Sequence, residues 1–169
     1  LPFPFSRHVY NAALVDAQLK RYNNVHDYLK YLLQLGYPFY SLDNAPLFKV
    51  FFKTPEGKKL VAVKSQIKPI YNTEYRSAIV KMVEDDQFFR IKSGGYKLYS
   101  DTIRKIDKRN VDELLRLIDL HGFPSESKVG VDPTSLLHPL YSVIIIHQTK
   151  GPAQIYNFEK IVTEHMLQG

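Results

Sequence analysis

Four polar side chains fall on helix faces that are otherwise apolar, and their types suit acid–base chemistry. Asp86 follows Met82 by four positions, so it lies on the face that this helix is expected to bury, and Arg90 follows Asp86 by four more. His121 and His147 also follow apolar residues at helical spacing. A histidine can transfer a proton, a carboxylate can orient it, and an arginine can clamp an anion. We therefore predict that Asp86, Arg90, His121 and His147 meet in one cluster.

This cluster has a catalytic and a structural interpretation. The candidates are, for catalysis, Asp86, His121 and His147 and, for ligand binding, Arg90, Gln87 and Asn110. In the structural interpretation the same groups form a buried polar network that holds helices in register. Histidines in protein cores are more often structural than catalytic, and a buried charge must be paired. The structural interpretation is favoured, and catalysis is the alternative.

Neither a metal site nor a cofactor is predicted. The chain contains no cysteine, which excludes thiolate ligands and a cysteine nucleophile. Its six histidines never occur at the spacing H-x-x-x-H or H-x-x-E-H that zinc sites use. Asp86, His121 and His147 could hold a metal only if the fold assembled them. The pair Gly94-Gly95 lacks the further glycines and the preceding strand of a phosphate-binding loop, so it predicts a turn.

Positive charge is concentrated in one part of this 169-residue chain of net charge +6. Residues 49–81 hold eight basic side chains and two acidic ones. Such a stripe can attract nucleic acid or anionic lipid, but its few interleaved aromatic residues favour a solvated helix face. We do not expect nucleic-acid binding; if it occurs, its contacts are Lys49, Lys53, Lys64 and Lys68. No apolar run exceeds four residues, so no membrane span is predicted.

Apolar residues recur at helical spacing in the first part of the chain. Residues 8–22 and 24–36 predict two helices that a short turn forces to pack antiparallel. A short third helix is expected around Pro46, and a fourth runs from Pro55 to Pro69. This rhythm of helix pairs resembles degenerate tetratricopeptide-like repeats.

The second part of the chain predicts further helices. Residues 73–92 form the clearest one, and Asn110 is expected to open the next, over 110–121, through a capping box with Glu113. Residues 136–148 fit either a buried strand or a helix. An amphipathic helix is expected over 152–168.

Several of these residues occur in a recognisable order. The first block is Asp86-Gln87-x-x-Arg90, and the second is Asp107-x-x-Asn110-x-x-x-Leu114. The block His121-Gly122-Phe123-Pro124-Ser125 comes next, then Val129-Gly130 and an apolar helix that ends at His147. This pattern resembles a bacterial domain family of unknown function that carries D-Q-x-x-R and H-G-[W/F]-P-[S/T] motifs, over about residues 74–167. The resemblance implies a helical domain and supports the cluster, and it lends no established activity.

The expected fold is mostly α: helical pairs followed by a small helical bundle, with at most a minor sheet. Residues 1–70 and 71–169 are expected to form two domains, or one continuous domain. The expected function is a binding or interaction module for a protein or a small molecule, with a buried Asp–Arg–His cluster. The alternative is a small hydrolase or phosphate-handling enzyme that uses Asp86, Arg90, His121 and His147. The start at Leu1 without Met suggests that a leader has been removed, which favours a periplasmic or secreted protein.

Overall fold

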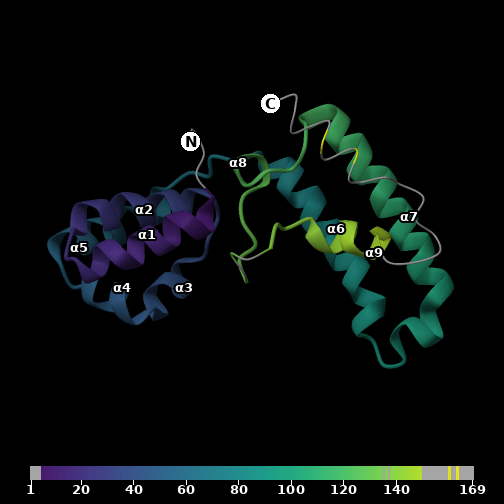
Figure 1. Cartoon of the computed structure of the whole chain (residues 1–169), viewed down its shortest axis with the longest axis horizontal. Coiled ribbons are helices and arrows are strands. Elements are labelled where there is room, and N and C mark those ends of the chain that lie inside the picture. The colour runs from purple at the N-terminus through teal and green to yellow at the C-terminus, as the bar shows by residue number, and fades with distance from the viewer. Residues whose placement is uncertain (1–4, 135, 137, 150–159, 161–162, 164–169) are drawn as a thin grey trace. The chain divides into compact units, whose positions relative to one another are not determined.

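The computed structural model describes residues 5–134, 136, 138–149, 160 and 163. Over these residues the secondary structure is helical and no strand occurs, which confirms the mostly α fold (Figure 1). In the same part of the chain, no helix is both long and apolar enough to cross a bilayer. The chain divides into two compact units, Leu1–Thr73 with Glu126–Pro139 and Glu74–Ser125 with Leu140–Gly169. We call them the first unit and the second unit.

The first unit begins with an antiparallel pair of helices, as predicted. Lys20 adopts a left-handed φ of 57° in the short connection between them, which ends the first helix earlier than expected. Thr54 then caps the fifth helix, because its Oγ1 accepts a hydrogen bond from the Gly57 N–H at 3.2 Å. The helices of this unit are α1 (Ser6–Gln18), α2 (Tyr22–Gln34), α3 (Phe39–Asn44), α4 (Pro46–Phe51), α5 (Pro55–Val63), a 3-10 turn (Lys64–Gln66) and α8 (Glu126–Val129).

An apolar core holds the first unit together. Val25, Leu29 and Leu32 lie on one face of α2 and are fully buried. They pack with α1, α4 and α5 around the buried rings of Phe48 and Phe51. Burial of this apolar stripe, rather than helix propensity, is what stabilises such short helices.

The segment after residue 125 returns to the first unit. Glu126 accepts hydrogen bonds from the backbone N–H and the hydroxyl of Ser6 at 2.7 and 2.8 Å. The Asn72 N–H donates to the Lys128 carbonyl, and the Val131 N–H donates to the Leu35 carbonyl. The first unit is therefore discontinuous in sequence.

The second unit contains two long helices and a short one, α6 (Thr73–Ile91), α7 (Gly95–His121) and α9 (Ser142–Thr149). Gly94 adopts a left-handed φ of 88° in the turn between α6 and α7, as the Gly-Gly pair predicted. Side-chain bonds between α6 and α7 occur in reverse order, from Asn110 to Met82 and from Tyr75 to Gly122. The two helices therefore form an antiparallel hairpin (Figure 1).

In the second unit, one prediction is wrong and one open alternative is decided. Asn110 does not open a helix: α7 starts at Gly95, and Asn110 lies in its interior with the amide bonded to the Met82 carbonyl. Its expected capping partner Glu113 instead accepts from Arg116. The ambiguous segment forms helix α9 over Ser142–Thr149. The helix expected over 152–168 lies outside the described residues, apart from positions 160 and 163.

Candidate functional site

Asp86 is the centre of a buried polar cluster in the second unit. Its side chain is 2% exposed, on the face of α6 that also buries Ile79 and Met82. Arg90, one turn further along α6, places its Nη1 3.3 Å from the Asp86 Oδ1 and 3.1 Å from the Asp86 carbonyl. The predicted contact between Asp86 and Arg90 is thus confirmed.

His147 of α9 completes the predicted group of acid, arginine and histidine. Its Nδ1 lies 2.9 Å from both carboxylate oxygens of Asp86. Gln87 also donates from Nε2 to the Asp86 Oδ2, at 2.6 Å. Both oxygens of this carboxylate are therefore occupied by side chains of the protein. A carboxylate only accepts hydrogen bonds, so in this contact the His147 Nδ1 is the donor.

A second carboxylate, Asp107 of α7, joins the cluster through Arg90. The Arg90 Nη2 donates to both carboxylate oxygens of Asp107, at 2.8 Å each, so the guanidinium lies between two acids. Asp107 stands in the family-like sequence pattern but was not among the predicted site residues, and residues 95–109 were not predicted to be helical. With that stretch helical, Asp107 follows the buried Ile103 by four positions, which would have placed it on the inner face.

The environment of Asp107 opposes its ionisation. Burial raises the pKa of Asp107 above 3.8, although the Arg90 hydrogen bond and charge lower it. The nearby Asp86 raises the same pKa, and His147 lowers it. Desolvation prevails over the arginine, so this carboxyl holds a proton more readily than a solvated one.

His121 lies elsewhere in the second unit. Its ring packs on that of Tyr75 with centroids 4.9 Å apart, and the Tyr75 hydroxyl donates to the Gly122 carbonyl. His121 follows Asp107 by fourteen positions in one helix, which at about 1.5 Å per residue puts about 21 Å between them along the axis. The structure does not bring His121 to the cluster. The face of α7 on which it lies was predicted correctly, but its position along the helix axis was not.

Asn110, a candidate for ligand binding, serves as a link between helices. It is 1% exposed, and its Nδ2 donates to the Met82 carbonyl at 2.9 Å. Its Oδ1 accepts from Arg109, which also bonds to Asp85 at 2.7 Å. Both ends of the amide are therefore used inside the protein.

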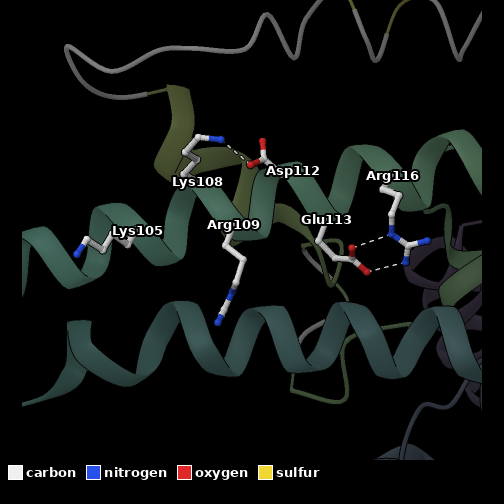
Figure 2. Close-up of a pocket in the computed structure, with 6 residues that line it drawn as sticks. All are labelled: Lys105, Lys108, Arg109, Asp112, Glu113 and Arg116. Carbon is white, nitrogen blue, oxygen red and sulfur yellow. Dashed lines mark hydrogen bonds and ion pairs between the residues drawn. The ribbon is translucent and has the colours of Figure 1, made fainter.

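The outer face of α7 carries a shallow groove with charged walls (Figure 2). Lys108 pairs with Asp112 at 2.6 Å, and Arg116 pairs with Glu113 at 2.7 Å. The lining residues are Lys105, Lys108, Arg109, Asp112, Glu113 and Arg116. Exposed pairs of this kind are screened by solvent, and the acids neutralise part of the positive charge. The groove does not include the Asp86 cluster.

Among the residues that the structure describes, no group of three or more His, Asp or Glu side chains is arranged to hold a metal ion. Comparison of the chain with protein-family models, with curated proteins and with solved structures gives no match.

Proposed function

We propose that the chain is a binding module in which the Asp–Arg–His cluster has a structural role. The observation that carries this proposal is the state of Asp86, which is 2% exposed and has both carboxylate oxygens occupied. A substrate would first have to displace these bonds. A partner, protein or small molecule, would instead bind an outer surface of the helices that the cluster holds together.

The cluster is well suited to holding α9 against the hairpin. An isolated helix of eight residues is unstable in water, so α9 depends on tertiary contacts. Ile144 supplies the apolar contact, at 1% exposed, and His147 supplies the polar one through Asp86. Arg90, bound between Asp86 and Asp107, fixes the register of α6 against α7.

The resemblance to the bacterial family of unknown function stays a prediction, and one feature supports it. Asp86, Gln87 and Arg90 are the three defined positions of the D-Q-x-x-R motif, and both Gln87 and Arg90 contact the Asp86 carboxylate. A structural cluster gives a physical reason for such a motif without any catalytic activity.

A small hydrolase or phosphate-handling enzyme is the second candidate, and one observation favours it. The Asp86–His147 pair has the geometry of a base and its orienting acid, and the His147 side chain is 26% exposed. Two observations weaken this candidate. Arg90 is already bound by two carboxylates and is not free to clamp an anion, and His121 lies on Tyr75.

The two candidates differ in what His147→Gln changes. On the structural proposal, His147→Gln and Asp86→Asn lower the free energy of unfolding, and the parent chain hydrolyses neither p-nitrophenyl phosphate nor p-nitrophenyl acetate above background. On the enzymatic alternative, the parent turns over one of these substrates and His147→Gln abolishes turnover with the fold intact. His138→Gln is the matched control, because His138 is exposed. Turnover that His147→Gln removes and His138→Gln retains would overturn the structural proposal.

A further inference from the structure

The turn between α6 and α7 carries an unusual concentration of exposed apolar side chains. We call residues 88–98 the hairpin tip. Phe88 is 55% exposed, Ile91 79%, Tyr96 53% and Leu98 68%. Leu98 lies directly over Gly94, where a Cβ would come within 2.3 Å of the Leu98 Cδ1, so its side chain covers the turn itself. Large apolar side chains gathered on a projecting turn are costly in water and mark a contact surface.

Basic residues occur at and beside this apolar group. The Arg104 Nε donates to the Tyr96 hydroxyl at 3.3 Å, and its Nη1 lies 3.8 Å from the exposed Asp101. The Lys92 Nζ lies 5.0 Å from the ring centroid of Phe88, 5.4 Å from that of Phe89 and 5.7 Å from that of Tyr99. Lys97, Arg104 and Lys105 are exposed nearby in the sequence, and Asp101 is the one exposed carboxylate between residues 88 and 105. The tip therefore combines an apolar end with a positively charged collar.

We propose that the hairpin tip docks on an anionic lipid surface, with Ile91 and Leu98 entering the interface. An apolar group alone or a basic patch alone binds membranes weakly, and the two together bind stably. Tyr96 has the amphipathic ring that prefers the headgroup level, and lysines can extend their stems along apolar groups while their charges reach lipid phosphates. The inference rests on the binding role proposed above and names a partner class for it.

Charge also argues against the other occupants of this surface. A second copy of the chain meeting tip to tip would bring like-charged collars together, which is repulsive. A polyanionic lipid surface instead attracts each exposed lysine or arginine that approaches it, and the attraction falls with salt. A projecting turn also fits a flat bilayer surface without needing a matching cavity in a partner.

The chain has no tryptophan, so one introduced indole reports its own position. Tyr96→Trp is expected to give blue-shifted fluorescence, quenched by brominated lipid, on vesicles of phosphatidylcholine with about 30% phosphatidylserine at low salt. Tyr40→Trp is the control, because Tyr40 is 64% exposed in the first unit. An unchanged spectrum for Tyr96→Trp, or an equal shift for Tyr40→Trp, would overturn the proposal.

Vesicle flotation tests the two parts of the tip separately. Ile91→Asp with Leu98→Asp, and Lys92→Glu with Lys97→Glu, are each expected to weaken partitioning by at least about tenfold. Val15→Asp with Leu19→Asp is the matched control, since these side chains are 57% and 53% exposed on the first unit. Circular dichroism verifies the fold, and the charge-reversal pair keeps the test valid if the aspartate pair unfolds.

Three results would contradict lipid docking. These are equal binding to neutral and anionic vesicles, unchanged binding of both tip variants, and a concentration-dependent dimer that only the tip variants abolish. The last would assign the surface to self-association. None of these outcomes depends on the Asp86 cluster, so His147→Gln tests the structural role independently.

Discussion

The two units place their buried polar groups differently. In the first unit, Ser6 and Asp16 are buried near the ends of α1, where they bond to Glu126 and to Asn24. The core between the helices is apolar. In the second unit, Asp86 and Asn110 are buried within long helices and bond across the space between elements.

This difference separates two ways of fixing helix positions. Apolar contacts are not directional, so a core such as that around Leu29 and Phe51 is specified by shape and volume. A guanidinium between two carboxylates is directional and satisfies its partners in one register only. Arg90, between Asp86 and Asp107, and Asn110, bonded to the Met82 carbonyl, are directional links of this kind between α6 and α7, so we infer that they set the register of the hairpin. Three changes test the contrast, and the first is expected to have the largest effect.

Phe51→Ala should destabilise the first unit by about 3–5 kcal/mol, because it removes a large buried ring and leaves a cavity. Phe51 is fully buried, with ring centroids 6.1 Å from Tyr22 and 5.2 Å from Phe52. Urea unfolding measures the loss, which should be the same at acidic and neutral pH since no charge is involved. Val50→Ala, at a position 55% exposed, is the control and should change little. A loss that varies with pH would contradict the apolar description of this core.

Asp86→Ala should cost about 3 kcal/mol, at the lower end of the usual range for breaking a buried ion pair. The cost is not larger because Arg90 keeps its two bonds to Asp107. Thermal unfolding measures it, with Asp85→Ala as the control. Asp85 is the next residue, 32% exposed and paired with Lys81 and Arg109, so its loss should cost about 1 kcal/mol or less. Equal losses for the two variants would mean that the cluster is open to water.

Asp107→Asn should produce the smallest effect, a change in pH dependence. Burial raises the pKa of Asp107 above 3.8, so the folded chain binds this proton more tightly than the unfolded chain. The free energy of unfolding that Asp107 contributes is therefore highest below pH 3.8 and falls as pH rises through the window up to the raised pKa.

Urea unfolding from about pH 3.5 to about pH 6 checks this sign. The variant lacks the titrating proton, so its stability relative to the parent should improve as pH rises across the window. Glu113→Gln is the control, because Arg116 lowers the pKa of Glu113 and the opposite trend is expected. If the stability of the parent relative to Asp107→Asn rises with pH, the effect of Arg90 on the pKa of Asp107 prevails over that of burial.

The sequence predicted local features of the site better than distant ones. Asp86 and Arg90 lie one helical turn apart, so helical spacing alone predicts their contact. His147 was predicted to join the cluster because a polar side chain on a buried, apolar helix face must find a polar partner. The same reasoning failed for His121. Periodicity defines the face of a helix on which a residue lies, but it does not define which part of the helix axis packs against a partner.

The fold was predictable to a similar extent. The helix at 73–92 was predicted closely, since its apolar residues repeat over five turns. The first half of α7 was missed, although Tyr99, Ile103 and Ile106 recur there at helical spacing. Asn110 was misassigned as a cap because its side chain finds a partner on another helix, which no local pattern reveals.

The bonds from Ser6 to Glu126 and from Val131 to Leu35 have a consequence for folding during synthesis. During synthesis, α1 to α5 leave the ribosome first, followed by the whole α6–α7 hairpin, and only then by the residues that complete the first unit. A nascent chain ending at Thr73 lacks the carboxylate that accepts from Ser6, and Leu35 lacks its donor. The first unit therefore cannot reach its full set of bonds until most of the second has been translated, and completing that set requires a closure between residues 120 positions apart.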